Sequence, residues 1–275
     1  MARKQSARTI VGEPLAPAVL ARLGAFEELP ETPPDFDPAG SWVNKYLIFV
    51  CHGYVERGNE GVGVLRLERK PDESASGFVF TARQRIVQNT GHVHEVEVLA
   101  RCRADRLATP LTWRFLSRFE DPGGRKISGL AGEEQGELRD GKIVVTRDGA
   151  ERVRPLHGPV TSDWGLMEAV QRLAAGSGSV GPFVMLQAFT TLRAGQRIVD
   201  VREERVAEPI NGPLLRITQI GFGALPYDYW LFPDSRRLAV VATGPRAYIL
   251  NDRADEIVNR RLAAIRARAR ERGDG

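Results

Sequence analysis

The chain has 275 residues, 42% of them hydrophobic and 27% charged, so it is long enough to bury a substantial core and is not disordered as a whole. Lysine and arginine number 39 against 35 acidic residues, which leaves a net charge of +4. The basic residues are nearly all arginines spread along the chain, so charge alone is weak evidence for a nucleic-acid partner.

The start of the chain lacks the pattern of a secretory signal. Arg3, Lys4 and Arg8 give a basic start, but Glu13 and Pro14 interrupt the residues that would form the apolar segment. Elsewhere no window approaches the length of a membrane span. We therefore expect a soluble protein without a transmembrane segment. As the chain stands it would be cytoplasmic, and it would be periplasmic or envelope-associated if a signal peptide has been removed.

Residues 1–40 are expected to form an N-terminal extension. Val19, Leu20, Leu23 and Phe26 repeat at helical spacing behind Pro17, which predicts a short amphipathic helix. The stretch LPETPPDFDPAG that follows is rich in proline, which cannot donate to a sheet ladder, and it predicts a connector. The helix either docks on the body of the protein or binds another protein, and docking is the simpler interpretation.

A β domain is predicted over residues 41–251. Five strand-like segments follow one another at similar spacing, separated by turn residues: SWVNKYLIFVCHGYVERG, GVGVLRLERK, GFVFTARQRIVQ, HVHEVEVLARCRA and LTWRFLSRFE. This pattern predicts an antiparallel meander. Two Asp-Gly pairs, Asp140-Gly141 and Asp148-Gly149, then stand between short strand runs. Because Asp-Gly supplies the positive φ angles of tight hairpin turns, two hairpins are predicted there.

One helix interrupts the strands, over residues 162–175. Thr161, Ser162 or Asp163 supplies an N-terminal cap, and apolar residues then repeat at helical spacing, with Trp164 and Met167 widening the apolar face. A helix this apolar is expected to cover a sheet. Strands resume with FVMLQAFTTL, QRIVDVREERVA and PLLRITQIGF, then a hairpin in PYDYWLFPDSRRLAVVATG that turns at residues 233–235, and a last strand in RAYIL.

This order of elements resembles uncharacterised bacterial envelope-associated proteins built as a β half-barrel. It is also similar to the lipoprotein-carrier fold, in which a curved sheet wraps helices around an apolar cavity. The resemblance extends from Trp42 to Leu250 and depends on Trp230, the turn at residues 233–237 and the helix at 162–175. It implies a mainly β fold, an antiparallel curled sheet or half-barrel with one covering helix and a C-terminal helix. It supplies no catalytic residue.

The segment Tyr227 to Phe232 holds four aromatic residues in six positions. In a strand, Tyr227 and Tyr229 point to one face, and Trp230 and Phe232 point to the other. Such rings either fill a core or line a pocket, and core packing is the preferred interpretation for Trp230. If the concave face binds an apolar ligand, the candidate ligand-binding residues are Tyr227, Tyr229, Trp230, Phe232, Trp164 and Met167.

Histidine and cysteine offer the other chemistry to consider. His92 and His94 form an H-x-H pair that would place two imidazoles on one strand face, where His52 or His157 would have to complete a zinc shell. No carboxylate pattern accompanies the pair, so hydrogen-bonded or solvated histidines are preferred and no metal or cofactor is expected. Cys51 and Cys102 lie in strand-like segments, and either a disulfide or two free thiols fits them.

Motifs of catalysis are missing. The chain contains no G-x-S-x-G elbow, and GSGSVG lacks the Gly-Lys-Ser/Thr ending of a phosphate loop. We predict no catalytic residue.

Residues 252–275 predict a basic C-terminal helix. Val258, Leu262, Ile265 and Ala269 repeat along one side, and the acidic residues lie near the start of the helix while arginines crowd its end, as the helix dipole favours. A solvated helix stabilised by this charge order is the first interpretation. The alternative is contact with an anion or partner, through Arg260, Arg261, Arg266, Arg268 and Arg270.

These patterns rank three classes of function. The first is a non-catalytic carrier-like or scaffold protein, whose concave sheet face binds a lipid-like or other apolar ligand. The second is an interaction subunit that uses its terminal helices on a protein or anionic partner, and the third is a hydrolase or metal enzyme. A single basic helix without aromatic residues argues against specific nucleic-acid binding.

Overall fold

The computed structural model describes residues 15–26, 29–51, 59–72, 76–173, 178–206, 210 and 212–273. Three α-helices are present in these residues: α1 (Pro17–Arg22), α2 (Asp163–Arg172) and α3 (Ala254–Gly273). The strands are β1 (Trp42–Val50), β2 (Glu60–Asp72), β3 (Gly77–Val87), β4 (Val93–Arg103), β5 (Pro110–Glu120), β6 (Gly132–Arg139), β7 (Lys142–Arg147), β8 (Ala150–Pro155), β9 (Val160–Ser162), β10 (Val180–Gln187), β11 (Thr191–Val206), β12 (Gly212–Ile220), β13 (Tyr227–Leu231), β14 (Leu238–Thr243) and β15 (Arg246–Leu250).

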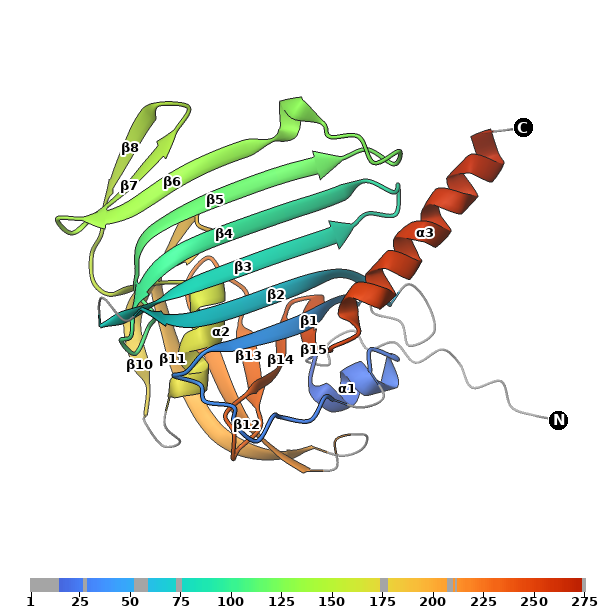
Figure 1. The fold of residues 1–275 in the computed structure, drawn as a ribbon. Helices are drawn as coiled ribbons and strands as arrows, with labels where there is room; N and C mark the ends of the chain where they lie inside the picture. The colour runs from blue at the N-terminus through green and yellow to red at the C-terminus, as the bar shows by residue number, and fades with distance from the viewer. Residues whose placement is uncertain are drawn as a thin grey trace.

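All fifteen strands of the described residues belong to one sheet, in the order β8-β7-β6-β5-β4-β3-β2-β1-β15-β14-β13-β12-β11-β10-β9. Neighbouring strands are antiparallel except β9 and β10, which are parallel. The sheet curls around α2, so that the long strands β2 to β6 form one wall and the strands that follow α2 form the other (Figure 1). The predicted mainly β, curled antiparallel sheet with one covering helix and a C-terminal helix is confirmed.

The inner core lies between the two walls. Leu65 and Phe80 from the first wall pack in one buried cluster with Leu166 of α2 and with Met185 and Tyr229 from the second wall. The helix begins where the sequence predicts, because the Ser162 hydroxyl accepts a hydrogen bond from the amide of Gly165 at 2.8 Å. It ends at Arg172, and residues 174–177 of the predicted helix and its following linker lie outside the described residues.

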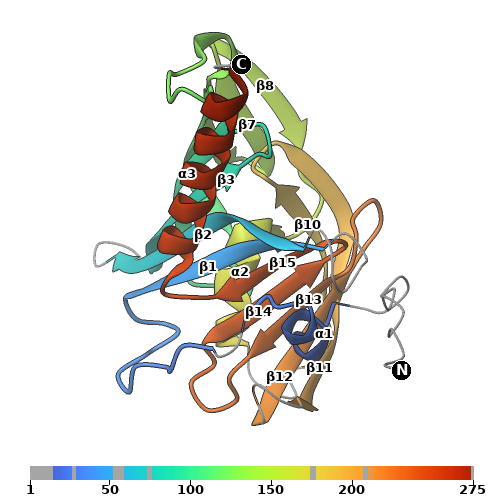
Figure 2. The same cartoon turned by 90° about the vertical axis from the view of Figure 1, so that its right-hand side faces the viewer.

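Two helices cover the outer face of the sheet (Figure 2). Leu20 of α1 packs in a cluster with Trp230 and Val240, so the N-terminal helix docks on the body. Val258 and Leu262 of α3 pack in a second outer cluster over β1 to β4. The apolar stripe predicted for the C-terminal helix is therefore buried over its first half, whereas its last turns are exposed.

The proline-rich connector is held against the sheet by two buried arginines. Arg69 donates from Nη1 to the carbonyls of Ala39 and Gly40, the latter at 2.7 Å. Arg237 donates from Nη1 to the carbonyl of Glu31 at 2.9 Å. Because carbonyls are the only hydrogen-bonding backbone groups that proline retains, arginine donors suit this segment.

Both Asp-Gly turns are formed as predicted. Asp140 and Gly141 have φ angles of 52° and 68°, and Asp148 and Gly149 have 51° and 76°. These left-handed conformations are those of a type I′ turn, and they join β6 to β7 and β7 to β8. The turn predicted at residues 233–235 is also present, between β13 and β14.

Cys51 and Cys102 are buried and are not joined in a disulfide. Cys51 packs in the outer cluster under α1, and Cys102 packs in the inner cluster. Of the two alternatives that the sequence allowed, free thiols are the one found. Burial raises the pKa of the Cys102 thiol well above its usual range, so that this sulfur is held protonated and unreactive.

Candidate functional site

The aromatic strand β13 is buried on both faces. Tyr229 and Trp230 are 0% and 1% exposed and point in opposite directions, as the strand alternation predicts. Tyr229 packs in the inner cluster together with Trp164 and Met167 of α2. Trp230 lies in the outer cluster. The structure therefore brings three of the six candidate ligand-binding residues together and separates Trp230 from them.

The other two candidates, Tyr227 and Phe232, are partly buried. Tyr227 stacks on Tyr229 with 6.1 Å between the ring centroids. Phe232 packs against both clusters, at the end of the strand. The walls of the sheet are thus filled by side chains around β13, and the cavity that best suits an amphipathic ligand lies elsewhere on the inner face.

That cavity, here named the seam pocket, opens between the edge hairpin β7–β8 and the turn that joins β10 to β11. Its volume is about 230 Å³. Apolar side chains from both sides of the curl form most of its surface, and arginines lie along one rim. The lining residues are Glu134, Ile143, Val145, Arg147, Arg152, Arg154, Leu186, Phe189, Thr190 and Leu192.

The register of the β7–β8 hairpin places the rim arginines. Arg152 is paired with Val145, and Arg154 is paired with Ile143, so both arginines share the face of those two apolar residues. Val153 between them is 51% exposed on the opposite face. Our sequence reasoning did not select these arginines, although the Asp148-Gly149 turn fixes the register that carries them inward.

The facing wall of the seam pocket is set by an unusual turn. Ala188 and Phe189 have φ angles of 47° and 56°, a left-handed conformation that is uncommon for residues other than glycine. Phe189 is buried and contacts Trp113, with 5.6 Å between the ring centroids. The turn is tied to the start of α2, because the amide of Ala188 donates to Asp163 Oδ2 at 3.1 Å.

Charge in the seam pocket is not balanced. Arg147 pairs with Glu134, with 3.2 Å between Nη1 and Oε1. Arg152 and Arg154 have no carboxylate partner in the part of the chain that the structure describes. Two guanidinium groups beside an apolar wall favour an anionic group attached to an apolar chain.

Asp163, which accepts a hydrogen bond from the turn at the seam pocket, is a titratable group. Burial raises the pKa of this carboxyl from 3.8 to about 6, against the lowering effect of its hydrogen bonds from the amides of Ala188 and Trp164. The folded state therefore binds a proton at a higher pH than the unfolded chain does. The resulting stabilisation is fully present below about pH 4 and is lost as the pH rises through about 6.

We expect Asp163→Asn to remove this pH dependence. The free energy of unfolding of the parent protein, minus that of the variant, should fall between about pH 4 and pH 6 and stay level at higher pH. Urea unfolding of both proteins across this range measures the difference. A difference that is constant, or that rises with pH, would contradict the raised pKa.

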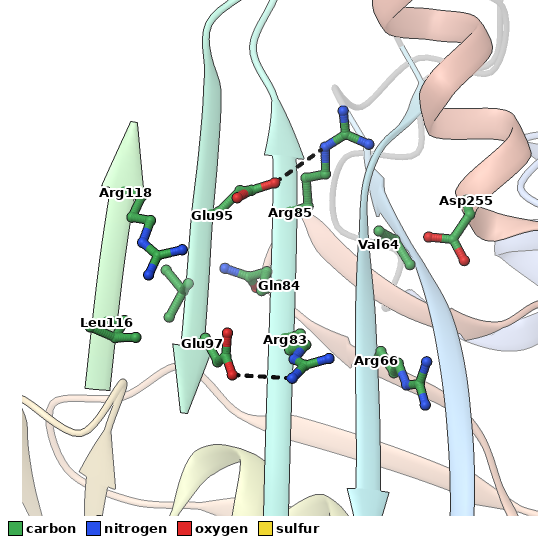
Figure 3. A pocket seen from close by; sticks show the side chains of 11 residues that line it. Val64, Arg66, Arg83, Gln84, Arg85, Glu95, Glu97, Leu116, Arg118 and Asp255 are labelled. Atoms are coloured by element: carbon green, nitrogen blue, oxygen red, sulfur yellow. Dashed lines mark hydrogen bonds and ion pairs between the residues drawn. The ribbon is translucent and has the colours of Figure 1, made fainter. Parts of the chain in front are cut away.

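A second depression lies on the outer face of β2 to β5, beside the start of α3 (Figure 3). Arg66, Arg83, Arg85 and Arg118 line it together with carboxylates. Arg83 pairs with Glu97 at 3.2 Å and Arg85 with Glu95 at 3.7 Å, as the dashed lines in Figure 3 mark. Since neighbouring carboxylates already balance most of these arginines, this face is a solvated ladder of ion pairs.

The arginines of α3 fall into two groups. Arg261 pairs with Glu60, and Arg266 lies 4.0 Å from Glu120, so these two hold the helix against the strand ends. Arg260, Arg268 and Arg270 are exposed. The first turn carries Asp255 and Glu256, in agreement with the predicted charge order. Contact of the exposed arginines with an anion or a partner stays a prediction.

The histidines make local contacts. His94 donates to or accepts from the Ser117 hydroxyl at 3.0 Å and stacks on Phe119, with 4.1 Å between the ring centroids. His92 makes a similar bond to Thr90 at 2.8 Å, and His52 lies outside the described residues. Within the described ranges, no group of three His, Cys, Asp or Glu residues is placed to bind a metal ion. No described helix is long and apolar enough to cross a membrane.

These features define a mainly β protein with a curled sheet around one helix and an arginine-rimmed pocket at its seam. No protein-family model matches the chain, and no curated protein matches it. Among solved structures, it is similar to a beta-barrel-like protein of the domain of unknown function DUF1849 from Brucella abortus. The two share 14% sequence identity with a TM-score of 0.48, over 78% of this chain and 99% of that chain.

Proposed function

We propose that the protein is a non-catalytic carrier that binds a small amphipathic anion in the seam pocket. The ligand class is an acyl or alkyl chain that ends in a carboxylate or a phosphate. The observation that carries the proposal is the position of Arg152 and Arg154, which have no acidic partner among the described residues and flank an apolar wall. This proposal moves the ligand from the rings of β13 to the seam of the curled sheet.

The walls supply the apolar half of the recognition. Leu186, Phe189 and Leu192 face Ile143 and Val145 across the pocket. Its volume of about 230 Å³ lies just below the range of roughly 300–1,000 Å³ that is usual for small-molecule sites, which favours a short chain. The pocket residues Ile143, Leu186 and Phe189 belong to the same inner cluster as Tyr229, Trp164 and Met167. Tyr229, Trp164 and Met167 would therefore pack behind the pocket wall without contacting the ligand.

The rim supplies the polar half. A guanidinium group presents a planar fork of donors that matches a carboxylate or a phosphate, and two such groups lie on neighbouring positions of one strand face. Inward-pointing charges on an edge strand also discourage pairing with another molecule. The two roles are separable by experiment, because edge protection requires charge of either sign whereas anion binding requires positive charge.

We expect the parent protein to bind decanoate more tightly than decanol, and the double variant Arg152→Gln, Arg154→Gln to bind decanoate about tenfold more weakly. Tenfold corresponds to roughly 1.4 kcal/mol, a modest value because both guanidinium groups are exposed to water. Isothermal titration calorimetry measures both affinities. The matched control is Arg268→Gln, Arg270→Gln, which removes two exposed charges from α3 and should leave decanoate binding unchanged.

A third double variant, Arg152→Glu, Arg154→Glu, separates anion binding from edge protection. If the arginines bind the head group, this variant should lose decanoate binding and keep the oligomeric state of the parent protein, since charge at the edge is kept. Equal affinity of the parent and both rim variants for decanoate would contradict the proposed function.

A further inference from the structure

The loop between β12 and β13, residues 221–226, presents an apolar tip to solvent. Phe222 is 90% exposed and is the most exposed of the large hydrophobic residues that the structure describes. Leu225 in the same loop is 58% exposed, and Ile220 at its base is 41% exposed. A phenylalanine held almost wholly in water loses the stabilisation that its burial would provide, so its placement calls for an occupant outside the chain.

The loop is held in this position from below. The side-chain Nε2 of Gln196 donates to the carbonyl of Phe222 at 3.1 Å, and its Oε1 accepts from Nε2 of Gln219 at 2.6 Å. Both glutamines are fully buried. A Cβ atom at Gly221 would overlap the Gln196 side chain, and Gly223 has a φ of 70°. These contacts shape the loop before it meets any partner.

Positive charge surrounds the tip. The Arg193 guanidinium lies next to Gly223, since a Cβ at that glycine would be 3.4 Å from Arg193 Nη1. Arg197 of β11 is paired with Ile220 of β12. The Leu225 side chain lies against Gly244, and Arg246 is two residues further along the chain. The segments 187–199, 219–227 and 243–248, which carry these residues, contain no aspartate or glutamate. Asp228, which follows the second segment, is paired with Arg216 at 3.1 Å.

We propose that the loop at residues 221–226 docks the protein on an anionic lipid bilayer. Phe222 and Leu225 enter the interface between headgroups and acyl chains, while Arg193, Arg197 and Arg246 face the lipid phosphates. An exposed apolar tip flanked by three arginines is complementary to such a surface. This inference goes beyond the proposed carrier function and does not depend on it.

The docking loop is linked to the seam pocket through two consecutive residues of β11. Leu192 lines the pocket, and Arg193, its neighbour in sequence, contacts the loop at Gly223. A bilayer that holds the loop would therefore be close to the turn at residues 188–190, and an amphipathic anion could exchange between the two. Vesicle binding and decanoate binding are separate measurements, so failure of one proposal is distinguishable from failure of the other.

The test is co-sedimentation of the full chain with vesicles of equal parts phosphatidylglycerol and phosphatidylcholine, compared with phosphatidylcholine alone. We expect binding to the anionic vesicles that weakens as salt is added, and at least tenfold weaker binding for Phe222→Ser, Leu225→Ser. Arg197→Gln, Arg246→Gln should weaken binding about 25-fold, since each arginine near an anionic surface contributes about fivefold. Thermal unfolding of each variant should match the parent protein, because the changed side chains are exposed.

Two control variants assign the binding to this loop. Leu130→Ser, Val153→Ser removes two other exposed apolar side chains, 55% and 51% exposed, and should leave vesicle binding unchanged. Arg268→Gln, Arg270→Gln on α3 should do the same. The proposal is overturned if the parent protein does not bind anionic vesicles, if the loop variants bind as the parent does, or if only the α3 variant loses binding.

A tryptophan reporter reads insertion directly. The chain has four tryptophans, and Trp42, Trp113, Trp164 and Trp230 are all buried, at 1–6% exposure. Phe222→Trp adds an exposed indole, whose emission should shift to the blue when anionic vesicles are added and remain unchanged with phosphatidylcholine alone. An emission that stays that of exposed indole on vesicles that do bind the protein would show docking through another surface and contradict the proposal.

Discussion

Glu168→Ala is expected to lower the free energy of unfolding by about 3–5 kcal/mol, because it leaves a buried cation without its partner. Glu168 and Arg69 are 0% and 2% exposed, and Glu168 Oε1 accepts from Arg69 Nε at 2.8 Å. The same carboxylate accepts from Arg172 Nε and Nη2 at 2.8 and 2.9 Å. The carboxylate thus joins α2 to β2 through Arg69, while Arg172, one turn further along α2, supplies its other hydrogen bonds.

Arg69 increases the expected loss because it also orders the connector. Its Nη1 donates to the carbonyls of Ala39 and Gly40, and its guanidinium lies 4.4 Å from the centre of the Phe78 ring. Without Glu168, this arginine must either remain buried and unpaired or move and release the connector. Urea unfolding, followed by circular dichroism, measures the change in free energy.

Two controls accompany this measurement. Glu256→Ala breaks the exposed ion pair that Glu256 of α3 makes with Arg253, just before the helix, and should cost less than about 1 kcal/mol. Arg69→Met combined with Glu168→Leu removes the buried cation together with its partner and should cost less than Glu168→Ala alone. Arg172 then loses its carboxylate but is partly exposed and keeps its hydrogen bonds to the carbonyls of Ala104 and Asp105. A loss below about 1 kcal/mol for Glu168→Ala would show that the pair is hydrated in solution and would contradict its role in the core.

Local elements were predictable because their signals are local. The Asp140-Gly141 and Asp148-Gly149 turns require positive φ angles that these residues adopt at low cost, and the hairpins follow from them. Ser162, one of the three caps that the sequence allowed, accepts a hydrogen bond from the amide three residues on. The alternation in β13 correctly predicted that Tyr229 and Trp230 face opposite sides.

The candidate site was not predictable in the same way, because it depends on contacts between distant segments. Nothing in the sequence states that the sheet curls until the β7–β8 hairpin faces the turn at Phe189, and only that curl makes Arg154 part of a pocket. Glu168 in an otherwise apolar helix face was a usable signal for a buried ion pair, since a carboxylate at such a position needs a partner. Phe222 between two glycines was a usable signal for an exposed tip.

The aromatic strand gives the second large expected effect. Trp230→Ala should lower the free energy of unfolding by roughly 3–5 kcal/mol, the usual cost of emptying a buried tryptophan site. Trp230 packs with Leu20 of α1 and with Leu23, which caps the end of that helix, in the outer cluster. The loss should therefore be accompanied by release of the N-terminal helix, which faster tryptic cleavage after Arg22 would report.

Two further variants serve as comparisons for Trp230→Ala. Trp230→Phe keeps most of the buried ring and removes an indole N–H that has no hydrogen-bond partner, so it should cost much less than Trp230→Ala. Tyr229→Ala empties the inner cluster instead, and should destabilise the protein without exposing Arg22 to trypsin. Urea unfolding gives the free energies for all three.

Decanoate binding by the same variants decides what the rings of β13 do. Trp230 faces away from the inner cluster that backs the seam pocket, so Trp230→Ala should retain the affinity of the parent protein for decanoate under conditions where it remains folded. Phe189→Leu, at the pocket wall, should weaken that affinity while leaving α1 in place. The opposite result, loss of decanoate binding by Trp230→Ala with stability nearly intact, would move the ligand back to β13 and show that its aromatic side chains form a binding surface.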